Sequence, residues 1–188
     1  MRATTAAPPP RVPSAADLRR ALLNGGDLAG FGPGDGGETP DGAGGCAAID
    51  SDYSGGASAT AQVLLSKGSA GPFIRERLNQ LSVQAAQNAV SRIRGASSCG
   101  SFTTDLPGLG KIDVQATALG VPGPGDDAGG VRLTMRPRGI DVTVYENIVA
   151  VRRGGTLILL THTSVGSVDD ALTSTAASRA YDKTKQVW

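Results

Sequence analysis

The second half of the chain holds four strand-sized segments joined by short turns, and this pattern most restricts the fold. Residues 111–118 and 131–136 alternate polar and apolar side chains, as strands with one face in water do. Residues 140–151 and 156–163 follow, separated by an Arg-Arg-Gly-Gly turn. Strands with short connections pair as antiparallel neighbours. Residues 157–160 are apolar without a break, which predicts a central strand of an antiparallel sheet.

The remaining segments predict three helices and one more strand. Residues 14–24 begin with the helix-capping pattern Ser-Ala-Ala-Asp and predict a short helix. Residues 57–67 predict a strand that ends at a glycine. From residue 72 to residue 94, apolar side chains recur every three or four positions, which predicts the longest helix. Residues 167–185 predict a last helix, with an acidic start and a basic end that suit the helix dipole.

Together these elements predict an α+β fold. We expect an antiparallel β-sheet with the two main helices packed on one face, plus a short N-terminal helix. Residues 1–13 are rich in Thr, Ala and Pro, so we expect a disordered tether. Residues 14–188 then form a single domain, which suits a chain of 188 residues.

The charge balance argues against a nucleic-acid partner. The chain has 18 basic and 17 acidic residues, without a long run of either sign, and its few aromatic residues are scattered. A nucleic-acid-binding surface is typically a basic stripe with aromatic side chains for stacking. No segment approaches the roughly 20 apolar residues that span a membrane.

The N-terminal sequence bears on the location of the protein. No apolar segment typical of a signal peptide follows the first residues. The chain is therefore either cytosolic or begins after a removed export signal. The Pro-rich tether favours the second interpretation, with the domain extracellular and secreted or attached to the membrane only through an N-terminal lipid anchor.

Cys46 and Cys99 are the two cysteines, and each lies beside glycine. Neither is part of a Cys-x-x-Cys motif, and a zinc site needs more ligands than they and one histidine readily provide. In an exported chain an even cysteine count favours a disulfide, which would close a loop of about 54 residues. The alternative is two separate buried thiols.

His162, the single histidine, and a group of arginines are the candidate functional side chains. His162 is either a base or pH-sensing group, or a strand residue that binds a backbone carbonyl, and the second interpretation is favoured. If their strands pair, five arginines could together bind an anion or an acidic partner. The alternative is an ordinary solvated face. These arginines are Arg132, Arg136, Arg138, Arg152 and Arg153.

No motif for catalysis, metal binding or cofactor binding is complete. The Gly-rich run at 30–34 lacks the Lys-Ser/Thr pair and the helix of a phosphate-binding loop. The acidic doublets do not have the spacing of a calcium loop. We therefore expect no catalytic residues, no metal and no cofactor.

Five short motifs occur in an order that resembles a known family. They are residues 27–31, Cys46, residues 99–102, residues 151–156 and residues 180–183. With this order of motifs, the chain resembles actinobacterial surface lipoproteins and the PknH-type extracellular sensor domain of a mycobacterial serine/threonine kinase. The resemblance covers residues 14–185 and implies an antiparallel sheet with helices, disulfide bonds, a ligand cleft and no known catalytic residues. The kinase sensor has two disulfides, whereas this chain offers one at most.

The resemblance implies a non-catalytic extracytoplasmic domain of a cell-envelope lipoprotein, which binds or senses a small molecule or an envelope component. Loops 31–45 and 121–130 are the candidate rim of its site. The alternative is a protein-interaction module of the envelope that uses a sheet edge or the arginine surface. A hydrolase is a third and weaker hypothesis, and the sequence gives no oligomeric state.

Overall fold

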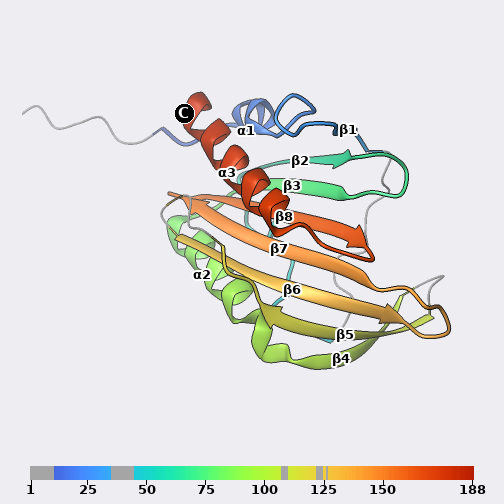
Figure 1. The fold of residues 1–188 in the computed structure, drawn as a ribbon. Coiled ribbons are helices and arrows are strands. Elements are labelled where there is room, and N and C mark those ends of the chain that lie inside the picture. Colours follow the sequence, from blue (N-terminus) through green and yellow to red (C-terminus); the bar gives the residue numbers. More distant parts are fainter. Residues whose placement is uncertain (1–10, 35–44, 107–109, 122–124, 126) are drawn as a thin grey trace, which may run out of the picture.

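The computed structural model describes residues 11–34, 45–106, 110–121, 125 and 127–188, and these form one sheet with three α-helices (Figure 1). The helices are α1 (Ala15–Ala21), α2 (Val83–Gly95) and α3 (Asp170–Val187), with a short 3-10 helix η1 (Ala96–Cys99). The strands are β1 (Gly32–Pro33), β2 (Ala59–Ser66), β3 (Phe73–Gln80), β4 (Ser101–Leu106), β5 (Gly110–Ala118), β6 (Asp127–Pro137), β7 (Val144–Arg153) and β8 (Thr156–Val165).

The strands pair in the order β1-β2-β3-β8-β7-β6-β5-β4, and every pairing is antiparallel. The four strands expected in the second half of the chain are confirmed as β5 to β8. The central position expected for residues 157–160 is also confirmed, because β8 lies between β3 and β7. The α+β class with an antiparallel sheet is therefore confirmed.

The helix expected from residue 72 to residue 94 is wrong in its first part. Residues 73–80 form β3, and helix α2 begins only after the N-cap Ser82, whose hydroxyl accepts the Ala85 N–H at 3.1 Å. Ile74 and Leu78 are four apart, a spacing that fits both a helix and alternate positions of a strand. Pairing with β2 on one side and β8 on the other decides for the strand. The sequence patterns also gave no expected strand at the position of β4.

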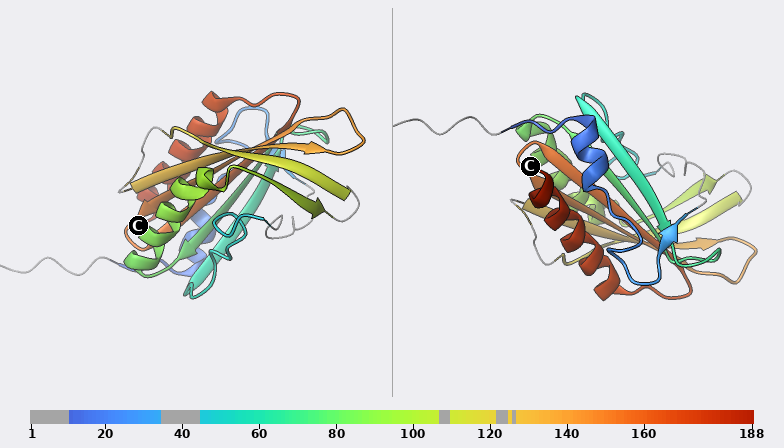
Figure 2. Two further views of the ribbon diagram at one scale, coloured as in Figure 1. Left: turned by 90° about the horizontal axis from the view of Figure 1, so that it is seen from below. Right: turned by 90° about the horizontal axis from the view of Figure 1, so that it is seen from above.

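The two main helices lie on opposite faces of the sheet, so their expected packing on one face is wrong (Figures 1 and 2). Ile148 and Ala150 of β7 pack into the cluster beneath α2, while Val149 and Val151 pack into the cluster beneath α1 and α3. A central strand that is apolar on both sides must be covered on both sides. Each face therefore receives its own helix.

Both terminal helices have the expected kind of cap. Before α1, the Ser14 hydroxyl accepts the Asp17 N–H at 3.2 Å, and the Asp17 carboxylate accepts the Ser14 N–H at 2.9 Å. Helix α3 begins slightly later than expected, with Asp169 as its N-cap; its carboxylate accepts the Leu172 N–H at 3.0 Å. Such caps satisfy amide donors that have no partner inside the helix.

The disulfide expected between Cys46 and Cys99 is present, with an S–S distance of 2.02 Å. Cys99 ends η1 directly after α2, and Cys46 is buried in the cluster beneath α2. The bond therefore ties the segment that follows residue 45 to the end of α2.

Parts of three expectations lie outside the described residues. These parts are residues 1–10 of the tether, residues 35–44 of one candidate rim loop, and residues 122–124 and 126 of the other. The boundary of the expected domain at residue 14 stays a prediction. Among the helices in the described ranges, none has the length and apolar composition needed to cross a membrane.

We expect the Cys46→Ser/Cys99→Ser double variant to fold with a free energy of unfolding about 4 kcal/mol below that of the wild type. The physical reason is that opening a loop of this length releases conformational entropy in the unfolded chain. Urea unfolding followed by circular dichroism measures the difference. The reduced wild type is the matched control and should agree with the variant; an unchanged unfolding midpoint in both would contradict the stabilising role.

Candidate functional site

None of the helices in the described part of the chain covers one half of one sheet face. Helices α1 and α3 cover β2, β3, β7 and β8, and the same face of β4, β5 and β6 is open at the front of Figure 1. Strand β5 shows the difference between the two faces. Ile112, Val114 and Ala116 are buried on the α2 side, whereas Asp113 and Gln115 are exposed on the open side. This open half is the polar surface that the alternation of residues 111–118 predicts.

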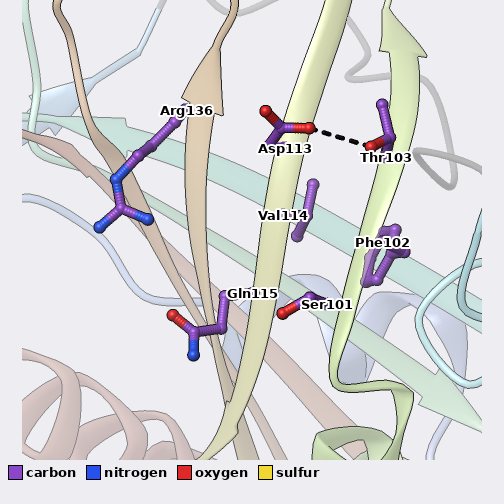
Figure 3. A pocket seen from close by; sticks show the side chains of 7 residues that line it. All are labelled: Ser101, Phe102, Thr103, Asp113, Val114, Gln115 and Arg136. Carbon is purple, nitrogen blue, oxygen red and sulfur yellow. Dashed lines mark hydrogen bonds between the residues drawn. The ribbon is translucent and has the colours of Figure 1, made fainter.

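A shallow pocket of about 350 Å³ lies on this open half, across three neighbouring strands (Figure 3). Its polar lining side chains are Ser101 and Thr103 from β4, Asp113 and Gln115 from β5, and Arg136 from β6. Antiparallel pairing fixes their spacing, since Ser101 is opposite Gln115 and Asp113 is opposite Arg136. The pocket is therefore built on strands rather than on loops.

Asp113 is already occupied by protein partners. The Arg138 guanidinium donates to its carboxylate at 2.7 and 3.1 Å, and the Thr103 hydroxyl donates to it at 2.9 Å. The Arg138 and Thr103 hydrogen bonds hold the pKa of Asp113 below its usual range. Both members of the ion pair are about half exposed, so it adds little to stability.

Arg136 makes no hydrogen bond or ion pair with any part of the chain that the structure describes. It lies directly opposite Asp113 across the β5–β6 pair, yet Asp113 binds Arg138 instead. Figure 3 shows the Arg136 side chain turned away from the Asp113–Thr103 hydrogen bond. Arg136 therefore lines the edge of the pocket with its guanidinium donors exposed to solvent.

The structure does not bring the five candidate arginines together. Arg132 lies on the open face, where its Nε donates to Asn147 at 2.9 Å and its Nη2 pairs with Asp170. Arg152 is opposite Asp127, at the other end of β6 from Arg136. Arg153 donates to the Thr184 carbonyl at 2.9 Å and stacks on Trp188. Since neighbouring strand residues point to opposite faces, Arg152 and Arg153 also diverge from each other.

His162 belongs to a buried polar network beneath the first turn of α3. Its Nδ1 lies 2.7 Å from the Thr173 hydroxyl, which also accepts a hydrogen bond from the Asn147 amide at 2.9 Å. Arg132, Asn147 and His162 form one row across β6, β7 and β8. Burial lowers the pKa of the imidazole. His162 therefore lies within β8, and its partner is a side-chain hydroxyl rather than the backbone carbonyl that the favoured interpretation expected.

Glu76 is a fully buried carboxyl that the sequence reasoning missed. The Leu23 N–H donates to its Oε2 at 2.6 Å, while Oε1 has no hydrogen-bond partner among the described residues. Burial raises the pKa of Glu76 to about 7, against the opposing effects of the Leu23 amide and of Lys183. In the helix expected for residues 72–94, Glu76 was not part of the apolar stripe, so its burial was not expected. Its strand parity with the buried Ile74 and Leu78 is the signal that could have found it.

We expect stability to fall as the pH rises from about 4.5 to 7, because folded Glu76 holds its proton in a range where the unfolded chain releases it. Glu76→Gln should remove the Glu76 part of this slope, leaving that of Glu146, whose pKa burial also raises, and should unfold at pH 8 with a free energy on the order of 3 kcal/mol above that of the wild type. Urea unfolding at several pH values measures it. Asp141→Asn, at an exposed carboxyl, is the control; an identical slope in wild type and Glu76→Gln would contradict the assignment.

We expect Thr173→Val to lower the free energy of unfolding by about 1–3 kcal/mol, because it leaves buried polar groups of His162 and Asn147 without their shared partner. Thr175→Val makes the same chemical change at an exposed position of the same helix and should have little effect. Thermal unfolding compares the two variants. Equal destabilisation would mean that helix propensity, not the buried network, sets the cost.

No model of a known protein family matches this sequence, and no curated protein sequence matches it either. Among solved structures, the fold is similar to the extracellular domain of PknH from Mycobacterium tuberculosis. The TM-score is 0.66 at 14% sequence identity, and the likeness covers 94% of this chain and 98% of that chain. The resemblance that the motif order indicated is therefore confirmed at the level of the fold: this chain has a fold similar to that of the extracellular domain of PknH.

Proposed function

We propose that this chain is a non-catalytic extracellular domain that binds or senses a ligand in the cell envelope, as part of a lipoprotein. The observation that carries the proposal is the fold likeness to the PknH extracellular domain, because it extends over 94% of this chain rather than over one motif. Fold alone is a weak guide to function, so the site itself must also support binding.

The Cys46–Cys99 disulfide supports the extracellular location. Disulfides form and persist in oxidising compartments, and they are rare in the cytosol, where thiols are kept reduced. This bond joins two residues that are 53 positions apart in the sequence, and the loop that it closes contains β2, β3 and α2.

The chemistry of the pocket favours binding over catalysis. Asp113 is held ionised by Arg138 and Thr103, which makes it a weak base. Arginine keeps its proton at neutral pH, so Arg136 is a hydrogen-bond donor and a charge rather than a proton carrier. His162, which is the one imidazole of the chain, is fully buried beneath α3.

A protein-interaction module is the second candidate, and one observation favours it. Within the described residues, β4 is the last strand of the sheet and pairs only with β5. An edge strand leaves backbone donors and acceptors to which an extended segment of a partner can pair.

A thermal-shift screen against cell-wall fragments and lipids tests the proposed function. A ligand at a hundred times its Kd should raise the Tm by about 5–10 °C, since it stabilises the folded state by about 2.7 kcal/mol.

Labelling of intact cells with a membrane-impermeant reagent tests the location. Turnover in broad esterase and peptidase assays would contradict a non-catalytic role. A protein captured from envelope extract, and lost with Thr103→Pro in β4, would favour the second candidate instead.

A further inference from the structure

We propose that the pocket around Arg136 is a binding site for the oxyanion of a small carboxylate- or phosphate-bearing molecule. This inference rests on the proposed binding function and specifies its ligand class. Arg136 binds the anion, and Gln115 and Ser101 bind polar groups beside it.

The first step is the state of Arg136 relative to its neighbours. The nearest arginines in the sequence on either side have carboxylate partners, because Arg132 pairs with Asp170 and Arg138 with Asp113. Arg136 lines a pocket, yet makes no hydrogen bond or ion pair with the described chain. A guanidinium is always charged at neutral pH, and its planar set of donors matches the two oxygens of a carboxylate or phosphate.

The second step is the nearest competing carboxylate. Asp113 is opposite Arg136 in the β5–β6 register, where opposite charges normally pair. Arg138 and Thr103 occupy it instead. Because Arg138 compensates the charge of Asp113, the group of Arg136, Arg138 and Asp113 keeps a net positive charge. The pocket therefore attracts an anion although a carboxylate lines it.

The third step is the neutral lining. Gln115 and Ser101 are exposed and opposite each other on β5 and β4, and Gln115 is diagonal to Arg136 on the neighbouring strand β6, because Arg136 is opposite Asp113. The amide and hydroxyl each offer a donor and an acceptor. Figure 3 shows both side chains at the end of the pocket away from the Asp113–Thr103 hydrogen bond. A volume of about 350 Å³ is at the lower end for ligand sites, which limits the ligand to a small molecule.

The experiment is an NMR titration of the full chain at constant ionic strength, with inorganic phosphate in one arm and glutarate in the other. Sodium chloride is the reference salt. Saturable shifts should appear at the Arg136 Nε–H, the Gln115 side-chain amide and the Ser101 N–H. The two arms show which oxyanion the site prefers.

Arg136→Gln should weaken this binding about tenfold or more, because it removes charge-assisted hydrogen bonds. Arg136→Lys should retain part of it, since the charge remains but the planar pair of donors is lost. Arg19→Gln is the matched control, as it makes the same charge change at an exposed position on α1, and its affinity should equal that of the wild type. Wild-type-like thermal unfolding of each variant establishes that it is folded.

Two results would overturn the inference. One is the absence of saturable shifts in the wild type with either anion up to about 50 mM, well above the weakest specific affinities. The other is equal affinity in Arg136→Gln and the wild type. If one of these two results holds while an envelope fragment still raises the Tm of both Arg136→Gln and the wild type, the oxyanion site fails and the proposed function stands. If the anions bind at Arg136 but no envelope component does, the site stands and the proposed function fails.

Discussion

The structure depends on the burial of β7 and β8 on both of their faces. Val149 and Val151 pack on one side of β7, and Ile148 and Ala150 pack on the other, so neither face of the sheet centre can be left in water. This requirement places α2 on one face and α3 with α1 on the other. The eight-stranded sheet is wider than these helices, and the β4–β6 half of the α3 face stays open. The candidate site lies on that open half.

Helix α3 is held to the sheet by buried polar groups as well as by apolar packing. At its first turn, buried Thr173 joins His162 and Asn147 of the sheet. Near its end, partly buried Lys183 forms an ion pair at 2.7 Å with Asp27 in the loop after α1. Glu76 lies buried between the loop after α1 and the sheet. Buried polar groups are costly unless they are paired, so they fix one position of the helix more strictly than alanine packing alone would.

The pocket and the buried groups have different chemical characters. Arg136, Gln115 and Ser101 are exposed on strands and offer hydrogen-bond donors at the surface, which suits reversible binding. Glu76, with its pKa raised to about 7, and His162, with a lowered pKa, are instead enclosed beneath helices. Their titration acts on the stability of the fold, whereas the pocket acts on what the domain binds.

The sequence by itself determined the elements whose signal is local. Alternation identified β5 and β6, an unbroken apolar run identified β8, capping patterns identified α1 and α3, and the cysteine count identified the disulfide. It did not determine β3, because the spacing of Ile74 and Leu78 fits two periods and only pairing with distant β2 and β8 chooses between them. The same limit applies to the site. Residues 101, 115 and 136 come to line one pocket through strand register. Arg136 was one of five equivalent candidates until the structure showed that Arg132 and Arg138 bind carboxylates and that Arg152 and Arg153 lie elsewhere. Local periodicity specifies which face a side chain takes; long-range pairing alone specifies its neighbours.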